Sequence, residues 1–382
     1  MINNLKSKII SVILSIIIAL GTISGLNFSA FALPTQSGDY IYNILADGTA
    51  ELSSYSGNDK NLVIPSMIDG YTVTSIADEL YCNCVNITNV TIPNSITSIS
   101  VNAFFGCSNL NNVSIPNSVT HIYRNAFCGC SSLTSIMIPD SVQYIGDNAF
   151  GMCTNLTDIT FSKNLSSLSE DLFHGCTSLS NIDIPDNILN IGCDAFLDTA
   201  YYNNSSNWDN GILYLDNCLI SVNRDEIYGD YIIKPGTRII AEEAFLGCGN
   251  LTNVTLPDSL IEIDCGVFKS CDSLTSITIP NSISYIGEDA FDECICLSYV
   301  YYPGTEVDWN LINIDTGNDP LYTATKYFNS TSGQSTDIKS NFDGSFSFST
   351  VIKYIVAVAL VFLVVILIII ILVKKDKLFQ KK

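Results

Sequence analysis

The chain is poor in charged residues, in basic residues and in histidine. Only 14% of its 382 residues are charged, and 38 acidic residues against 17 basic ones give a net charge of -21. Such an acidic chain repels phosphate backbones, which excludes nucleic-acid binding. Because His121 and His174 are the only histidines, a multi-histidine metal centre cannot form.

Catalytic motifs are lacking as well. The sequence contains no G-x-S-x-G, no H-E-x-x-H and no phosphate-binding glycine loop. The two histidines stand at variable positions of the repeat described below. We therefore expect no enzyme, no cofactor and no metal site.

The first 32 residues are typical of a secretory signal peptide. Lys6 and Lys8 precede the apolar run 9–20, and Ala30-Phe31-Ala32 supplies the small residues of a cleavage site. We expect residues 1–32 to direct export, and an uncleaved N-terminal anchor is the alternative.

A longer apolar segment lies near the other end. Residues 354–373 are 20 consecutive apolar or aromatic residues, the length of a transmembrane helix. The tail 374–382 contains five lysines, and the positive-inside rule therefore places it in the cytoplasm. The expected protein is a single-pass protein of the cell membrane, with all that precedes the helix outside.

Between these ends the sequence repeats every 23 residues. Ile-Pro begins at Ile92, Ile115 and Ile138 and returns at Ile184, two periods later. An Ala-Phe pair and a cysteine three residues after its Phe keep the same spacing, as in Ala149-Phe150 and Cys153. A period this regular predicts a solenoid of stacked coils.

One repeat shows the physical logic of a coil. Ile136 and Ile138 are two residues apart, as a strand with one buried face requires. Pro139 has no amide hydrogen, so the chain turns after the strand. A single coil cannot bury its own apolar face. We therefore predict about ten stacked coils with a parallel β-sheet on one face.

The consensus L-x-x-I-x-I-P-x-S-V-x-x-I-x-x-x-A-F-x-x-C resembles the BspA-like class of leucine-rich repeats, found on bacterial and some protist cell surfaces. The resemblance covers roughly residues 59–303. It implies a leucine-rich-repeat stack and a role in adhesion to host or neighbouring-cell molecules.

The repeated cysteine position has two interpretations. In an exported protein the row could form a disulfide or metal ladder. Alternatively the cysteines are buried free thiols, because cysteine is a small hydrophobe that suits a tight interior row. We favour the second interpretation for the row Cys84, Cys107, Cys130, Cys153, Cys176, Cys248, Cys271 and Cys294.

Segments outside the repeat complete the predicted organisation. Residues 33–58 read as a capping hairpin around Asp47-Gly48, followed by the solenoid at 59–322 and a polar, flexible stalk at 323–353. An insertion at 200–230 reads as a second hairpin, with Trp208 as a candidate contact residue or as structural decoration.

Side chains between the inward-facing strand residues should form a regular polar strip on the outer face of the sheet. Its hydroxyl, amide and carboxylate groups suit contacts with an extended ligand. The candidate strip consists of Asn112, Ser114, Ser135, Asp158, Thr160, Asn181, Asp183, Asn253, Thr255, Ser276, Thr278, Tyr299 and Tyr301.

Together these features predict a membrane-anchored surface protein that binds extracellular protein or glycan, like an adhesin. The alternative is a surface-coat or spacer protein without a specific ligand, because an array that binds nothing would carry the same repeats.

Overall fold

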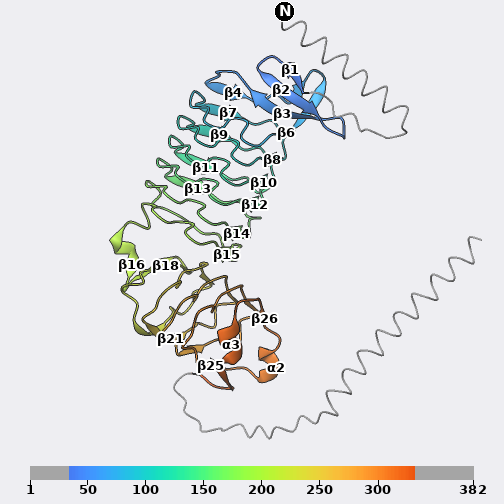
Figure 1. The fold of residues 1–382 in the computed structure, drawn as a ribbon. Coiled ribbons are helices and arrows are strands. Elements are labelled where there is room, and N and C mark those ends of the chain that lie inside the picture. Colours follow the sequence, from blue (N-terminus) through green and yellow to red (C-terminus); the bar gives the residue numbers. More distant parts are fainter. Residues whose placement is uncertain (1–33, 332–382) are drawn as a thin grey trace, which may run out of the picture. The chain divides into compact units, whose positions relative to one another are not determined.

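The computed structural model describes residues 34–331, which form a solenoid of stacked coils (Figure 1). Successive coils pair through short parallel strands. Each regular coil supplies one strand to a first ladder, just before the Ile-Pro step, and a two-residue strand to a second ladder. The predicted solenoid is confirmed by this stack.

The first ladder is divided into separate sheets. Residues 181–183 form no strand, and β9 (Asn112–Ser114) and β11 (Ser135–Met137) are in separate sheets. The sheet predicted as continuous is therefore segmented. Its three parts are β4 (Asn61–Val63), β7 (Asn89–Thr91) and β9; β11 and β13 (Asp158–Thr160); and β19 (Gly229–Ile232), β21 (Leu251–Thr255), β23 (Ser276–Thr278), β25 (Tyr299–Tyr302) and β27 (Thr325–Phe328).

The second ladder was not predicted. Its strands hold only two residues each, of which the second is apolar and mostly buried. It consists of β8 (Ser98–Ile99), β10 (His121–Ile122) and β12 (Tyr144–Ile145); β14 (Ser167–Leu168) and β15 (Asn190–Ile191); β20 (Ile239–Ile240), beside the insertion; and β22 (Glu262–Ile263), β24 (Tyr285–Ile286) and β26 (Asn313–Ile314).

The repeated Phe residues form a stacked column in the core. Phe127 lies 5.3 Å from Phe104 and 5.5 Å from Phe150, measured between ring centroids, and the planes differ by 2° and 5°. All three rings are completely buried. A second column begins at Phe245 beyond the insertion, and it continues through Phe268 and Phe291.

Backbone hydrogen bonds tie each turn around the column to the next coil. The amide of Phe104 donates to the carbonyl of Ala126 at 2.8 Å, and the amide of Phe127 donates to Ala149 at 2.8 Å. Asn102 and Asn125, two residues before these Phe residues, have φ values of 53° and 55°. Asn adopts this left-handed conformation more readily than most residues, so the turn keeps its geometry from coil to coil.

The N-terminal end of the stack is covered by a five-stranded sheet in the order β1-β2-β3-β6-β5. The strands β2 and β3 pair antiparallel across the Asp47-Gly48 turn, and β3 then pairs parallel with β6. The sheet therefore joins a hairpin to the first coil. Its strands are β1 (Thr35–Ser37), β2 (Tyr40–Ile44), β3 (Ala50–Tyr55), β5 (Met67–Ile68) and β6 (Tyr71–Ile76).

The insertion folds as an antiparallel sheet that joins the solenoid. Strand β18 pairs antiparallel with β17 and parallel with β20 of the next coil. All four residues of β17 are buried, so the insertion is part of the core. Its elements are the 3-10 turn η1 (Ser205–Asn207), β16 (Trp208–Asp209), β17 (Ile212–Leu215) and β18 (Cys218–Val222).

The C-terminal end of the solenoid runs further than predicted. The helices α2 (Glu306–Trp309) and α3 (Asp319–Thr323) lead to β27, which pairs parallel with β25. The predicted stalk begins at residue 323, but β27 extends the ladder to Phe328. Buried Trp309 and Leu321 hold this last, longer coil, and its polar composition concealed it in the sequence.

The fold-class prediction also included a C-terminal transmembrane helix, and this part requires correction. The only α-helices in the described part are α2 and α3, of four and five residues. Within residues 34–331, no helix has the length and apolar character needed to span a membrane. The predicted helix 354–373, the tail 374–382 and the signal peptide 1–32 lie outside the described residues.

The Phe column makes a stability prediction. Phe150→Ala removes a buried ring that contacts both Phe127 and Phe173, and it should lower the free energy of unfolding by about 3–5 kcal/mol. Chemical denaturation monitored by circular dichroism measures this change. Met137→Ala, at a side chain 71% exposed on the same stack, should change it by less than about 0.5 kcal/mol. Equal losses in the two variants would contradict the role of the column.

Candidate ligand-binding face

The N-terminal half of the predicted strip is exposed. Ser135 and Asp158 face each other across β11 and β13, and so do Met137 and Thr160. Asn181 and Asp183 are also exposed, although they lie outside any strand. The exposed members of this half are Asn112, Ser114, Ser135, Asp158, Thr160, Asn181 and Asp183.

The C-terminal half of the strip is more enclosed. Asn253, Ser276 and Tyr299 occupy one register row across β21, β23 and β25, and the Ser276 hydroxyl donates to Asn253 Oδ1 at 3.0 Å. Thr255, Thr278 and Tyr301 form the next row. Thr278 is only 4% exposed, and its hydroxyl has no hydrogen-bond partner among residues 34–331.

Tyrosines end the strip. Tyr327 of β27 stacks on Tyr301 with ring centroids 5.4 Å apart and planes within 17°. Tyr299 lies 6.1 Å from Tyr327 and is 43% exposed. The sequence analysis missed Tyr327, because it assigned this residue to the stalk. The alternation of Thr325 and Tyr327 with Lys326 was the available signal.

Trp208 is held in place by its own segment. Its indole N–H donates to the Tyr202 carbonyl at 2.7 Å, and its ring packs edge-on against Tyr202 at 5.2 Å. The ring also packs against the hydrophobic core. Because these contacts lie within the protein, they favour a structural role for the insertion over a role in ligand contact.

The cysteine row lies inside the solenoid as free thiols. Five buried thiols of the row donate to the carbonyl of the Phe 26 residues earlier, as Cys130 does to Phe104 at 3.3 Å and Cys153 to Phe127 at 3.3 Å, and Cys107 donates to the Tyr81 carbonyl in the same way. Burial raises the pKa of the Cys130 and Cys153 thiols well above the usual value. The row therefore packs and hydrogen-bonds the coils, and its thiols are poor nucleophiles and metal ligands.

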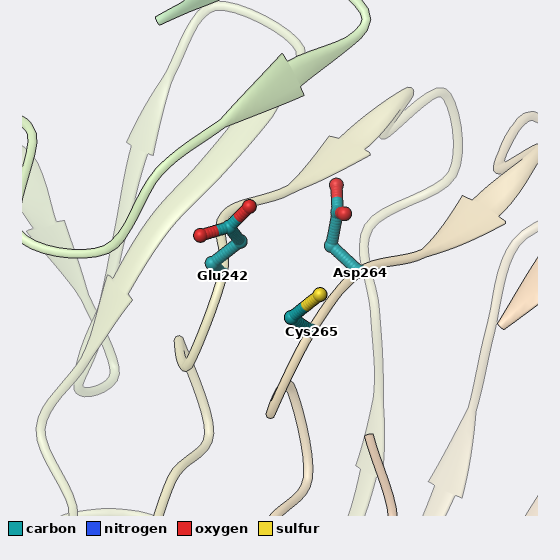
Figure 2. Close-up of side chains that lie close together, drawn as sticks. All are labelled: Glu242, Asp264 and Cys265. Atoms are coloured by element: carbon teal, nitrogen blue, oxygen red, sulfur yellow. The ribbon is translucent and has the colours of Figure 1, made fainter. Parts of the chain in front are cut away.

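One side-chain cluster could hold a metal ion. Glu242, Asp264 and Cys265 each offer a ligand atom, and these atoms lie within 4.8 Å of one another (Figure 2). The cluster follows β20 and β22, where Asn190 donates to Glu242 Oε1 at 3.1 Å. Asp264 occupies a position that is glycine in other coils, at Gly146, Gly192 and Gly287.

The cluster stands out for its electrostatics. Asp264 is buried, and this burial together with the nearby Glu242 carboxylate raises the pKa of Asp264 to about 6. No Lys or Arg forms an ion pair with either carboxylate among residues 34–331. Two adjacent carboxyl groups without a cation repel each other when both are ionised.

The histidines show no catalytic arrangement. His121 lies on the second ladder against Tyr123 and Tyr144, with ring centroids 5.9 and 6.0 Å away. The Nδ1 atom of His174 lies 3.0 Å from Asp171 Oδ1. Neither histidine has a Ser or Cys nucleophile as a hydrogen-bond partner within the part of the chain that the structure describes.

These features define a solenoid of the leucine-rich-repeat class. The family model described as the BspA type leucine rich repeat region matches residues 74–203 and 230–343, in 6 copies. The chain belongs to this BspA-type leucine-rich repeat family, which confirms the resemblance inferred from the consensus. Proteins built from these repeats generally bind or support other molecules, and no catalytic family is indicated.

Solved structures of bacterial leucine-rich repeat proteins are similar to this chain. A leucine rich cell surface protein from Faecalibacterium prausnitzii A2-165 is 25% identical, with 76% of this chain and 100% of that chain covered and a TM-score of 0.40. A leucine-rich repeat protein from Bacteroides ovatus ATCC 8483 is 22% identical over 77% and 90% of the two chains, with a TM-score of 0.39. The pneumococcal vaccine antigen PcpA is 19% identical over 78% and 88%, with a TM-score of 0.41. No curated protein matches the chain.

The carboxyl pair predicts a pH-dependent stability. The unfolded chain releases the Asp264 proton near pH 3.8, whereas the folded protein holds it up to a pKa of about 6. The free energy of unfolding should therefore fall as the pH rises between these values, by at most about 3 kcal/mol.

Asp264→Asn should remove this fall and make the protein more stable than the parent at pH 7. Denaturant unfolding between pH 4 and 7 measures both effects. Asp272→Asn, at an exposed carboxyl group, serves as the control and should leave the profile unchanged. If Asp264→Asn follows the parent profile, the carboxyl group is not the cause.

Proposed function

We propose that this protein is an exported surface protein that binds extracellular protein or glycan ligands through the polar strip of the first ladder. Membership of the BspA-type leucine-rich repeat family supports a role at the cell surface, because proteins of this class are found on cell surfaces and are implicated in adhesion. The observation that carries the proposal is the strip itself: exposed hydroxyl, amide and carboxylate groups repeat at the pitch of the coils, from Asn112 to Asp183.

The chemistry of the strip suits a neutral or cationic partner. Asp158 and Asp183 project from the exposed half, and no Lys or Arg is among its members. Parallel pairing holds neighbouring strip residues about 5 Å apart, so an extended ligand could contact several coils at once. Many weak polar contacts on a rigid ladder add up without a large ordering cost.

The strip can be tested on the full chain with a panel of glycans and extracellular-matrix proteins. The variant Asp158→Ala/Thr160→Ala/Asp183→Ala removes three exposed side chains and should weaken binding of a panel ligand at least tenfold, because their polar contacts are lost. Circular dichroism should show an unchanged fold. Surface plasmon resonance measures the affinity.

A control variant changes exposed residues beside the second ladder, in the same coils as the strip. Gln143→Ala/Ser166→Ala changes exposed residues there and should keep the parent affinity. Binding that is equal in both variants would rule out the strip as the binding surface. A parent chain that binds nothing in the panel would instead favour the surface-coat or spacer alternative.

A further inference from the structure

Glu242, Asp264 and Cys265 form a cluster beside the second ladder, whereas the polar strip lies on the first. Their ligand atoms lie within 4.8 Å of one another, and the side chains come from two neighbouring chain segments (Figure 2). The backbone ties these segments together, because the Glu243 amide donates to the Cys265 carbonyl at 3.1 Å. The spacing of the three side chains is therefore set by the stacking of the coils.

Glu242 lies where the chain returns from the insertion to the regular stack. Its amide donates to the Ile191 carbonyl at 2.9 Å, and its Oε1 atom accepts the Asn190 side-chain amide at 3.1 Å. Asn190 and Ile191 form β15, the last strand before the insertion. A hydrogen bond of this kind orients a carboxylate before a metal ion binds to it.

Asp264 carries a buried carboxyl group where close packing favours glycine. Gly287 occupies the same position one coil later, and a Cβ atom there would lie 2.7 Å from the Cys265 backbone nitrogen. Asp264 is nevertheless only 7% exposed, and no Lys, Arg or His forms an ion pair with it among residues 34–331. Its hydrogen-bond donors, the Asn190 side chain and the Cys265 backbone amide, are uncharged. A buried carboxylate without a cation is costly, and a bound cation would remove this cost.

Cys265 does not belong to the interior thiol row. Its side chain is partly exposed, whereas the thiols of the row that donate to Phe carbonyls are buried. Burial and the nearby carboxylates raise the pKa of the Cys265 thiol, so the free thiol keeps its proton at pH 7. A metal ion deprotonates a coordinating thiol: the S–H bond breaks, the metal–sulfur bond forms and the proton leaves to the solvent.

The donor atoms decide which cation fits. Zn²⁺ accepts both thiolate sulfur, at about 2.3 Å, and carboxylate oxygen, at about 2.0–2.2 Å, and four ligands are enough for it. Mg²⁺ and Ca²⁺ require six or more ligands that are nearly all oxygen. Because one of the three donors is sulfur, the cluster favours a transition-metal cation over these two.

We propose that Glu242, Asp264 and Cys265 bind one Zn²⁺ ion, with solvent in the fourth position. The ion removes the repulsion between the two carboxylates. Through Asn190 and Glu242, it also links the last coil before the insertion to the two coils after it. The expectation of no metal site followed from the scarcity of histidine, which this donor set does not need. The site is independent of the function proposed for the strip.

The experiment titrates the full chain, reduced and stripped of metal, with Zn²⁺ in an isothermal titration calorimeter. The parent should bind one Zn²⁺ per chain and should keep this affinity in an excess of Mg²⁺ and Ca²⁺. Co²⁺ in the same site should show a thiolate-to-cobalt charge-transfer absorption band, because Cys265 supplies the sulfur. Zn²⁺ should also raise the midpoint of thermal unfolding, because it binds the folded chain.

The variants remove one donor at a time. Cys265→Ser should abolish the charge-transfer band and weaken Zn²⁺ binding at least tenfold. Asp264→Asn and Glu242→Gln should weaken binding to a similar extent. For Asp264→Asn, unfolding would not explain the loss, because without metal this variant is expected to be more stable than the parent at pH 7. Cys296→Ser, at an exposed thiol, and Asp272→Asn, at an exposed carboxyl group, are the matched controls and should bind Zn²⁺ as the parent does.

A parent that binds no Zn²⁺, displacement of Zn²⁺ by Mg²⁺ or Ca²⁺, or full affinity in Cys265→Ser would overturn the inference. A charge-transfer band that persists in Cys265→Ser and is lost in Cys296→Ser would also overturn it, because the metal would then bind exposed thiols elsewhere. The strip variant Asp158→Ala/Thr160→Ala/Asp183→Ala should bind Zn²⁺ as the parent does. Failure of the zinc site and failure of the strip are therefore distinguishable.

Discussion

Equal coil length is the constraint on which the rest of the structure depends. A coil of 23 residues returns each side chain to the same place one layer further along, so that Phe stacks on Phe and thiol follows thiol. The Phe104 and Phe127 amides reach the next coil only because that coil is in register. No coil could satisfy these groups alone.

The interior and the surface of the stack obey different rules. Inside, the Phe column and the thiol row tolerate little change, because close packing and buried donors allow no gap. Outside, the strip varies freely from coil to coil, and this freedom is what allows a repeat protein to acquire a ligand.

Much of the fold could be predicted because the apolar residues recur every 23 residues, once in each coil. Ile136, Ile138, Phe150 and Cys153 lie in the core as their spacing indicates. The second ladder escaped prediction because two residues are too short a strand to show alternation. The final coil around Trp309 escaped because its composition is polar and its length departs from 23 residues, and Tyr327 was therefore left out of the predicted strip. The burial of the Thr278 side chain could not be foreseen, because Thr160 occupies the same position of the repeat and is exposed.

The register can be tested by deleting part of the stack. Removing residues 116–138, one full period, joins Ile115 to Pro139 and leaves every remaining coil in register. Removing 117–138 is one residue shorter and shifts the coils on either side of the junction. Thermal unfolding should show the first variant folded and cooperative, with a loss of stability no larger than one coil contributes, and the second strongly destabilised. Equal stability of the two deletions would contradict the account.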